Sequence, residues 1–466
     1  MLRWIVLGTT LFATCAFAQD VAQLPEDVKA QVDQLIQMGL DDEVGYTFVR
    51  DLTTDVGARL AGSPAEARAR EWSVQRLASL GFDDIVVEPF EIPYWSRRVD
   101  RARIVEPSPQ TLVVTALGGS TSTPEGGVDA PIVRFDSMQA LRVADASVVE
   151  GNIVFVDEKM TRTQDGSGYG MAVRKRRNCA KETASKGGLA CMIRSVGTQD
   201  RRFAHTGMMA RGEAVGDGPA AALSPPDADQ LTRLLEKGPV RVHLDIQVET
   251  RLKAPSGNVV VDIEGRETPQ EIVLIGCHLD SWDLGTGAVD DGAGCGIVVG
   301  AAQLINQLEI KPRRTVRVVL YGSEEVGLLG GFEYARKHAD ELPMHVLAAE
   351  SDFGAGRVWR FETRFGEGAL GYARAMQNAL APLNVTPGNN LATGGPDVSM
   401  LVRHGVPVVT PRQDGWDYFD LHHTPDDTFD KIDPEDVNQN VATYAAFVYL
   451  AAEMGWDFRR AKDASL

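Results

Sequence analysis

The sequence predicts an α/β fold, in which a mixed, largely parallel sheet is covered by helices on both faces. Short apolar runs rich in β-branched residues, such as 272–277 and 316–321, are typical of strands buried on both faces. These runs alternate with longer apolar segments of helical length, as expected of strands joined by crossover helices. The chain has 466 residues, more than one ordinary core accommodates, so we expect two domains.

Residues 1–18 have the pattern of a secretory signal peptide. Arg3 precedes an apolar run over residues 4–17, and Ala16 and Ala18 supply the small residues of a cleavage site. The run is short for a bilayer span, and no later stretch approaches about 20 apolar residues. We therefore expect an exported protein, periplasmic or secreted, with no membrane span after cleavage. An uncleaved anchor is the alternative.

Residues 19–100 are expected to form the first part of the larger domain. An amphipathic segment over 24–38 predicts a helix. A second helix is predicted to begin at Pro64, a residue favoured in a first helical turn, and to end at Gly81. Residues 85–92 predict a strand.

Residues 101–250 differ from the preceding residues in their sequence pattern, which predicts an inserted β-rich domain. Short apolar runs alternate with turns rich in Gly, Pro and Ser, and no long apolar helix stands out. One helix-like piece, 179–188, precedes a predicted strand at 189–194. An irregular extension of the main sheet is the alternative. The other predicted strands of this part are 111–117, 151–157 and 240–248.

Residues 251–466 resume the larger domain, with alternating strands and helices and no internal repeat. The predicted strands are 259–263, 272–277, 316–321, 346–350 and 406–410. The predicted helices are 292–308, 367–380 and 435–455.

Composition and charge narrow the classes of partner. Hydrophobic residues make up 44% of the chain and charged residues 24%, which is ordinary for a soluble globular protein. The net charge of −18 argues against nucleic acid or an anionic membrane surface as a partner, since neither attracts an acidic protein. The basic run Arg174–Arg177 is interpreted as a solvated face rather than an anion site.

Cysteines outside the signal peptide offer two pairings. In an oxidising compartment Cys179 can pair with Cys191, and Cys277 with Cys295, although the sequence does not fix the connectivity. Cys277 also precedes His278, which makes a zinc thiolate an alternative. Alternation along a strand points Cys277 away from the face that carries His278, and this favours a buried structural thiol.

Polar side chains gather where the predicted strands end. His278 and Asp280 follow the strand at 272–277, and they emerge together because residues i and i+2 of an extended chain share a face. Ligand sites of open α/β sheets lie beyond the carboxyl ends of the strands, so a site is predicted at this edge. The other polar residues at strand ends or in nearby loops are Asp290, Asp291, Glu324, Glu325, Asp352 and His423.

This set of residues, in this order, resembles the co-catalytic di-zinc aminopeptidases and glutamate carboxypeptidases. The resemblance covers most of the chain and implies an enzyme with two zinc ions per chain. It also implies that the β-rich insert is a protease-associated-like domain. The matching motifs are His278-x-Asp280, Asp290-Asp291-Gly292, Glu324-Glu325, Asp352, and His423 ahead of Asp427-Thr428.

The resemblance assigns a role to each of these residues. Glu324 would be the general base that activates a water shared by the two metals. Asp280 would accept a hydrogen bond from His278 and so fix its imidazole. Imidazole and carboxylate ligands suit a zinc ion that keeps an exchangeable position. The implied ligands are Asp290 bridging both ions, His278 and Asp352 at one, and Glu325 and His423 at the other.

Each motif alone has a simpler interpretation. A His-x-Asp pair at a strand end is usually an ordinary hydrogen-bonded pair, paired glutamates are usually solvated, and adjacent aspartates can cap a helix. Found together in the family's order, they favour a metal centre. His422 is an alternative to His423 by a register shift of one residue, whereas His404 matches no ligand and is interpreted as structural.

Two further segments lie near the predicted site. The loop 393–399 resembles a Gly-rich loop that lines the family's substrate cleft, but it departs from the commoner Ser-Asp-His form. The loop therefore does not predict which residues recognise the ends of the substrate. Trp416, Tyr418 and Phe419 are candidates for the cleft wall or a dimer contact, and core packing explains them equally well.

Together these features predict an exported zinc-dependent exopeptidase that hydrolyses dipeptides or short peptides. The resemblance implies substrates with a free amino end and a homodimer. The alternatives are a broad aminopeptidase of the same fold and a non-catalytic receptor or binding module, which would have lost ligands or the base. A serine hydrolase is disfavoured because the chain has no Gly-x-Ser-x-Gly motif.

Overall fold

The computed structural model describes residues 21–210 and 217–459, so the predicted signal peptide at 1–18 lies outside the described residues. The strands are β1 (Val86–Glu106), β2 (Gln110–Leu112), β3 (Val114–Ala116), β4 (Val128–Phe135), β5 (Ile153–Val156), β6 (Ala190–Arg194), β7 (Ala220–Leu223), β8 (Arg241–Ile263), β9 (Thr268–His278), β10 (Arg314–Tyr321), β11 (His345–Glu350), β12 (Val358–Arg364), β13 (Thr386–Pro387) and β14 (Val408–Gln413). The α-helices are α1 (Glu26–Leu40), α2 (Val44–Asp55), α3 (Pro64–Ser79), α4 (Met138–Val143), α5 (Ala146–Val149), α6 (Tyr169–Ser185), α7 (Pro225–Leu235), α8 (Ala293–Asn306), α9 (Leu329–Lys337), α10 (Leu370–Ala379), α11 (Ser399–Val402), α12 (Tyr418–Leu421) and α13 (Pro434–Glu453).

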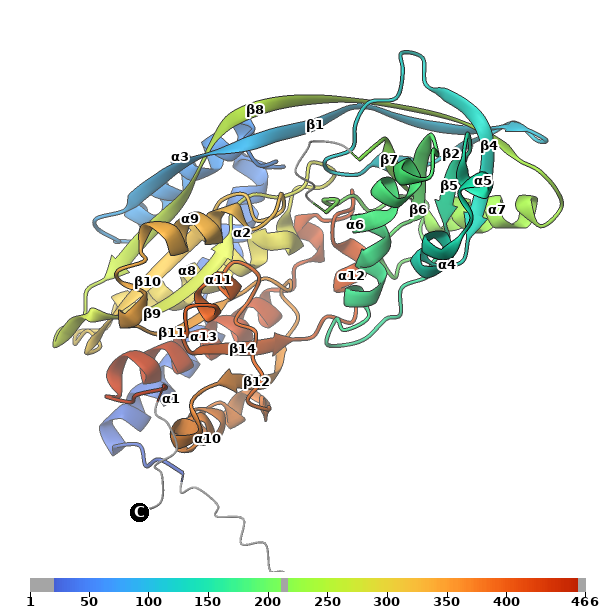
Figure 1. Cartoon of the computed structure of the whole chain (residues 1–466). Coiled ribbons are helices and arrows are strands. Elements are labelled where there is room, and N and C mark those ends of the chain that lie inside the picture. The colour runs from blue at the N-terminus through green and yellow to red at the C-terminus, as the bar shows by residue number, and fades with distance from the viewer. Residues whose placement is uncertain (1–20, 211–216, 460–466) are drawn as a thin grey trace, which may run out of the picture.

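One 14-stranded sheet passes through the molecule, in the order β13-β12-β14-β11-β9-β10-β8-β4-β5-β6-β7-β3, with β1 paired to β8 and β2. Figure 1 shows two lobes along this sheet. The larger lobe holds β9–β14 with α1–α3 and α8–α13, and the smaller lobe holds β2–β7 with α4–α7. The long strands β1 and β8 run through both.

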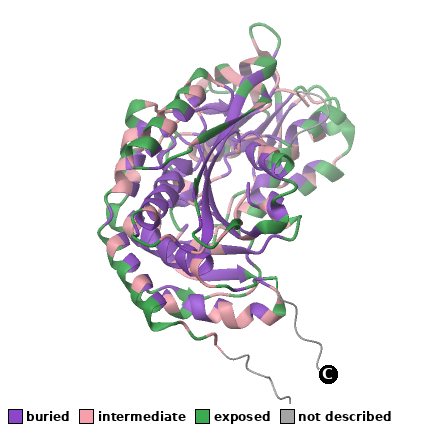
Figure 2. Ribbon diagram, turned by 90° about the vertical axis from the view of Figure 1, so that its left-hand side faces the viewer, coloured by how far each residue is buried: buried purple, intermediate pink, exposed green. Residues whose placement is uncertain are grey.

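The sheet of the larger lobe is mixed and largely parallel. Strands β10 and β11 lie parallel to β9 on either side of it, and β14 lies parallel to β11. Strand β8 is antiparallel to β10, and β12 is antiparallel to β14. Helices α1, α2, α8 and α13 pack on one another over one face, and α9 and α11 lie over the other. Figure 2 shows the buried sheet among helices with exposed outer faces, so the predicted fold class is confirmed.

Apolar sequence determines the core of this lobe. The run Ile272–Ile275 of β9 is buried on both faces, as its β-branched composition predicts. Helix α13 begins at Pro434 with the Asp433 side chain accepting the Glu435 N–H at 2.8 Å, and its following residues are nearly all buried. The segment Ala288–Asn306 is long and apolar enough to cross a membrane, but it is wholly buried and serves as a core helix.

A two-stranded ribbon of β1 and β8 joins the two lobes (Figure 1). The antiparallel pairing runs from Val86 opposite Val260 to Glu106 opposite Arg241. The predicted strand at 85–92 is one end of β1, and the two separate strands predicted at 240–248 and 259–263 are both parts of β8. The predicted domain boundaries near 101 and 250 therefore fall within continuous strands.

The part of the sheet that lies in the smaller lobe is largely parallel. Strands β4, β5, β6 and β7 are parallel neighbours, and apolar clusters pack on both faces. Helix α6 begins at Tyr169, earlier than the helix predicted at 179–188. Its first half is polar on the exposed side, with buried Ala172 and Val173 facing inward, so apolar periodicity alone did not reveal it.

The structure contains both of the cysteine pairings that the sequence left open. Cys179 bonds to Cys191 and ties α6 to β6, with 6.0 Å between the Cα atoms. Cys277 bonds to Cys295 and ties the end of β9 to α8, with 5.1 Å between the Cα atoms. A zinc thiolate at Cys277 is therefore wrong, because the sulfur is engaged in a disulfide.

The basic run on α6 is not simply a solvated face. Arg174 and Arg177 are exposed, but Lys175 and Arg176 are buried. The Lys175 ammonium donates to the Glu158 carbonyl at 2.6 Å. Burial lowers the pKa of Lys175 from 10.5 to about 7, against the attraction of the Glu158 carboxylate.

We expect Lys175→Met to raise the free energy of unfolding at pH 7 by about 1–3 kcal/mol. The substitution removes a buried amine, which costs free energy in the folded state whether it stays charged or loses its proton. Between pH 7 and 10.5 the Lys175 amine binds fewer protons in the folded protein than in the unfolded chain. The free energy of unfolding of the wild type therefore rises with pH through this range. The stability difference between the methionine variant and the wild type should shrink accordingly. Urea unfolding at pH 7 and pH 10 measures this. Lys181→Met, at an exposed lysine of the same helix, is the control. A difference that stays constant with pH would contradict the prediction.

Candidate metal centre

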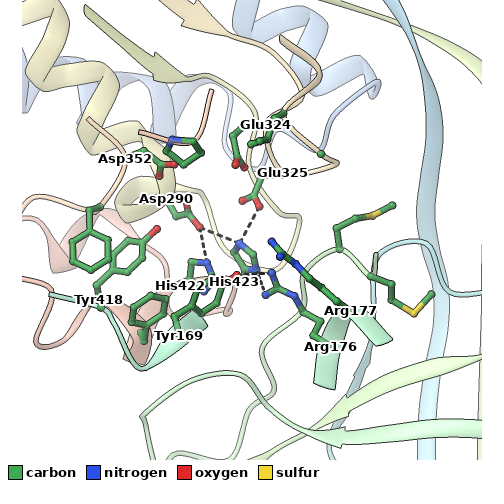
Figure 3. A pocket seen from close by; sticks show the side chains of 18 of the residues that line it. Tyr169, Arg176, Arg177, Asp290, Glu324, Glu325, Asp352, Tyr418, His422 and His423 are labelled. Atoms are coloured by element: carbon green, nitrogen blue, oxygen red, sulfur yellow. Dashed lines mark hydrogen bonds and ion pairs between the residues drawn. The ribbon is translucent and has the colours of Figure 1, made fainter. Parts of the chain in front are cut away.

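The ends of three neighbouring strands bring the candidate residues together. Strand β9 ends at His278, and the turns that follow β10 and β11 lie on either side of it because these strands run parallel to β9. A cavity of about 590 Å³ opens there (Figure 3). Its walls include His422, His423 and four acidic residues that we call the acidic cluster, namely Asp290, Glu324, Glu325 and Asp352.

Two imidazoles are held by main-chain carbonyls and face the same carboxylate. Nδ1 of His278 lies 2.9 Å from the Asp280 carbonyl oxygen, and Nδ1 of His423 lies 3.2 Å from the Thr206 carbonyl oxygen. A proton on each Nδ1 satisfies these contacts, so a metal ion can take the place of the proton on each Nε2. This is the tautomer in which a histidine binds a metal through Nε2.

The two oxygens of Asp290 face different imidazoles. Oδ1 lies 3.1 Å from Nε2 of His278, and Oδ2 lies 3.2 Å from Nε2 of His423. Nε2 of His278 is also 3.5 Å from Asp352, and Nε2 of His423 is 2.9 Å from Glu325. Ligand atoms around one tetrahedral zinc ion with bonds of 2.0–2.1 Å lie roughly 3.3 Å apart, so the spacings around each histidine suit a metal ion. Two groups of side chains bring their ligand atoms together: His278, Asp290 and Asp352 form one, and Asp290, His422 and His423 form the other.

The charges of the site favour a cation. Burial raises the pKa of Glu324, Glu325 and Asp352, and neighbouring carboxylates add to the increase. Burial acts in the same direction on Asp290, but hydrogen bonds to His278 and His423 lower its pKa well below the usual value. Oε1 of Glu325 is buried without a hydrogen-bond partner among the described residues. Divalent ions would balance this buried negative charge.

Asp280 acts on both sides of the site. Its carbonyl, rather than its carboxylate, lies nearest to Nδ1 of His278, since the carboxylate oxygen is 3.6 Å away. The buried carboxylate instead accepts the backbone N–H of Glu324 at 2.9 Å and of Glu325 at 3.3 Å. Asp280 thereby fixes the turn that presents both glutamates to the cavity.

The structure brings both adjacent histidines close to Asp290. His422 stacks on His423 with 3.5 Å between ring centroids, but its Nε2 is 3.7 Å from Asp290, farther than that of His423. His423 has φ of 61°, and its Nε2 also lies 2.9 Å from Glu325. The geometry favours His423 as the ligand. His404 lies on an exposed turn outside the cavity lining.

The smaller lobe supplies residues that the sequence did not assign to the site. Arg176 reaches His423, with Nη1 at 3.3 Å from Nδ1, and donates from Nη2 to the Tyr169 hydroxyl at 2.5 Å. The Thr206 N–H donates to the His423 carbonyl at 3.0 Å. A Cβ at Gly207 would lie 2.6 Å from Nδ1 of His423, so this close approach requires glycine.

The remaining segments divide between the cavity and its surroundings. Tyr418 and Phe419 are buried in the cavity wall, whereas Trp416 is 54% exposed and lines a neighbouring hollow. In the loop 393–399, Pro396 lines the cavity. The buried Asp397 accepts the Gly331 N–H at 2.8 Å and so fixes the loop against α9.

Known proteins resemble this chain over most of its length. The family model described as Peptidase family M28 matches residues 258–448. Carboxypeptidase Q from Mus musculus is 32% identical over 431 residues, which cover 92% of this chain and 90% of the relative. Carboxypeptidase Q from Homo sapiens is 32% identical over 430 residues, covering 92% of this chain and 89% of the relative.

Solved structures share the fold. A crystal structure described as a peptidase M28 precursor from Shewanella amazonensis SB2B has a TM-score of 0.91 at 48% identity, covering 94% of this chain and 99% of that one. An aminopeptidase from Aneurinibacillus sp. strain AM-1 has a TM-score of 0.65 at 21% identity, covering 92% of this chain and 98% of that one. At this identity the similarity concerns the fold only.

The fold, the site and these relatives define a metallopeptidase. The chain belongs to peptidase family M28, as the carboxypeptidase Q relatives and the family match show. The resemblance stated from the sequence is therefore confirmed.

Proposed function

We propose that this chain is an exported zinc-dependent exopeptidase that hydrolyses dipeptides or short peptides. One observation carries the proposal: the two oxygens of the buried Asp290 face Nε2 of His278 and Nε2 of His423, with Glu324 in the same cavity. The signal pattern at 1–18 supports export, and the carboxypeptidase Q relatives support action at a peptide end. A homodimer and a catalytic domain interrupted by an insert are parts of the same proposal, and the pairing of β1 with β8 favours insert ends at 107 and 240 over the predicted 101 and 250.

Five residues of this chain would hold two zinc ions. His278 and Asp352 would bind one, His423 and Glu325 the other, and Asp290 both. When bound, the ions would lower the pKa of a water and polarise the peptide carbonyl. Asp280 and Thr206 would keep the two imidazoles in the required tautomer through their carbonyl oxygens.

Glu324 would move the proton of the reaction. Its carboxylate would accept a proton from the attacking water as the oxygen–carbon bond forms. The same carboxyl group would give that proton to the peptide nitrogen as the carbon–nitrogen bond breaks, which releases a neutral amine. Hydrogen bonds from the backbone N–H groups of Glu324 and Glu325 to Asp280 fix the turn. In this turn Glu324 would act as the base and Glu325 would bind a metal ion.

Metal content and activity test the proposal together. The purified mature chain should contain about two zinc ions, and it should cleave dipeptides with a free amino end better than amino-blocked ones. Chelation should abolish cleavage, and added zinc should restore it. A metal-free protein that shows no turnover after zinc is added would reject the enzymatic proposal in favour of a binding module.

The histidine pair offers a second test. We expect His423→Gln to lose one zinc ion per chain and His422→Gln to keep both, because Nε2 of His423 alone is within 3.2 Å of both Asp290 and Glu325. Each substitution removes one imidazole from the same stacked pair, so each is the control for the other. Zinc analysis of the dialysed proteins decides. Loss of zinc from the His422 variant only would shift the ligand by one residue.

A further inference from the structure

The two proposed zinc positions are held in different ways. His278 ends β9 and lies within the sheet of the larger lobe, between β10 and β11. His423 lies in the turn that follows α12, residues 422–424, which we call the ligand turn. Figure 1 shows α12 against the smaller lobe, and the Thr198 N–H of that lobe donates to the Phe419 carbonyl at 3.0 Å. One position thus depends on a single lobe, and the other lies where the two lobes meet.

The smaller lobe binds the main chain of the ligand turn at two consecutive residues. Nδ1 of His205 lies 2.8 Å from the His422 carbonyl oxygen. The Thr206 N–H donates to the His423 carbonyl at 3.0 Å. These two carbonyls belong to the peptide planes on either side of the His423 Cα atom. Because each peptide group is planar, holding both planes fixes φ and ψ of His423 and so the direction of its side chain.

The backbone conformation of His423 requires such support. Its φ of 61° lies in the left-handed region, which residues other than glycine rarely adopt. A residue stays in this region only where the surrounding contacts over-determine its conformation. With this conformation Nε2 of His423 lies 3.2 Å from Asp290 and 2.9 Å from Glu325. The contacts from the smaller lobe therefore bear directly on the geometry of the proposed ligand.

His205 is itself fixed within the smaller lobe. Its backbone N–H donates to Ser195 Oγ at 3.0 Å, and that hydroxyl donates to the Leu223 carbonyl of β7 at 2.9 Å. A Cβ at Gly197 would lie 2.1 Å from Cε1 of His205, so the ring packs directly on the glycine backbone. A carbonyl oxygen only accepts, so Nδ1 carries the proton, and Nε2 is buried without a hydrogen-bond partner among the described residues. The one hydrogen bond that this imidazole makes in the described structure is therefore the bond to the ligand turn.

We propose that His205 is a positioning residue, which holds the ligand turn and so makes zinc binding at His423 depend on the smaller lobe. This inference rests on the proposed function for the metal, and it adds a residue that lies outside the cavity lining. Zinc at the other position should not depend on this contact, because the ligand His278 is hydrogen-bonded by Asp280 and Asp291 of the larger lobe. A single imidazole of the smaller lobe thereby affects the affinity of one ion and not of the other.

Zinc titration of the metal-free full chain tests the effect on affinity. His205→Leu, which keeps the approximate size but removes the donor, should weaken binding of one of the two ions roughly 10-fold and leave the other unchanged. His205→Asn should restore most of the affinity, because the asparagine amide nitrogen can take the place of Nδ1. His345→Leu is the matched control, since His345 is also buried, with Nδ1 at 3.0 Å from the Glu341 carbonyl, but lies at the end of β11 away from Asp352. It should leave both ions unchanged.

A second substitution identifies the ion that is affected. The His423→Gln variant should keep only the zinc ion at His278. In that variant, the further change His205→Leu should alter the affinity of the remaining ion by less than about twofold, because the two substitutions act on the same position. Weakening of the remaining ion in the double variant, or equal weakening of both ions by His205→Leu alone, would overturn the inference.

Amide hydrogen exchange separates this inference from the proposed function. In the metal-free protein, exchange in the ligand turn should be roughly 10-fold faster in His205→Leu than in the wild type, close to wild type in His205→Asn, and unchanged in His345→Leu. Mass spectrometry of peptides that contain residues 422–424 measures these rates. If the wild type bound no zinc, the proposed function would fail, and the exchange rates would still decide whether His205 holds the turn. Unchanged exchange in His205→Leu would overturn the positioning role.

Discussion

Replacing Glu324 by glutamine should reduce turnover by about three orders of magnitude and leave the metal content unchanged. Glutamine keeps the shape of the side chain and its place in the cavity but has no site for the proton of the attacking water. A positioned general base contributes roughly 10²- to 10⁴-fold to a rate. Glu324 lies in the cavity wall beside Glu325, and only the latter lies within ion-pair distance of His423.

The measurement is kcat with a dipeptide, together with zinc per chain. Glu71→Gln changes an exposed glutamate on α3 and serves as the control for the substitution itself. Near-normal kcat in the Glu324 variant would remove this residue as the base. Loss of zinc together with activity would make Glu324 a ligand instead.

Asp290→Asn should release both zinc ions and abolish activity. Asp290 offers one oxygen to each histidine, at 3.1 Å and 3.2 Å, so a single substitution affects both positions. Asparagine replaces one oxygen by an amide nitrogen, which donates hydrogen bonds and cannot bind a metal cation. Zinc affinity should fall by more than about 100-fold, the upper end of the effect of residues that only support a ligand.

Zinc titration of the apoprotein measures this affinity, and near-ultraviolet circular dichroism reports whether the fold is kept. Asp340→Asn alters an exposed aspartate and is the matched control. Retention of one tightly bound zinc ion in the Asp290 variant would contradict a shared carboxylate and indicate two independent sites.

The parts of the fold that depend on local sequence were predictable. The apolar runs of β9, β10 and β11 specify strands buried on both faces, and the helices between them follow from longer apolar segments. The acidic cluster was identified through the family resemblance, and each of its members also follows a recognised strand or precedes a recognised helix. The continuity of β8 was not, because the polar stretch in its middle is exposed and lacks strand periodicity.

The contribution of the smaller lobe depends on contacts that are distant in sequence. Arg176 and His423 are separated by 247 residues, and Thr206 and His423 by 217, so no local pattern reports their approach. The run Arg174–Arg177 shows why composition misleads here. Its four cations look equally solvated in the sequence, but the fold buries Lys175 and Arg176 and leaves Arg174 and Arg177 exposed. Only the three-dimensional packing reveals which is which.

The pairing of Glu106 with Arg241 has a consequence for the design of chimaeric proteins and for evolution within the family. The chain leaves the β1–β8 ribbon and rejoins it at neighbouring points, so residues 107–240 form a cassette with adjacent ends. That cassette carries Tyr169, Arg176 and Arg177, but none of the five proposed zinc ligands. Exchanging the cassette between relatives at these two points, rather than near 101 and 250, would alter substrate selectivity. The five proposed zinc ligands would remain those of the recipient protein.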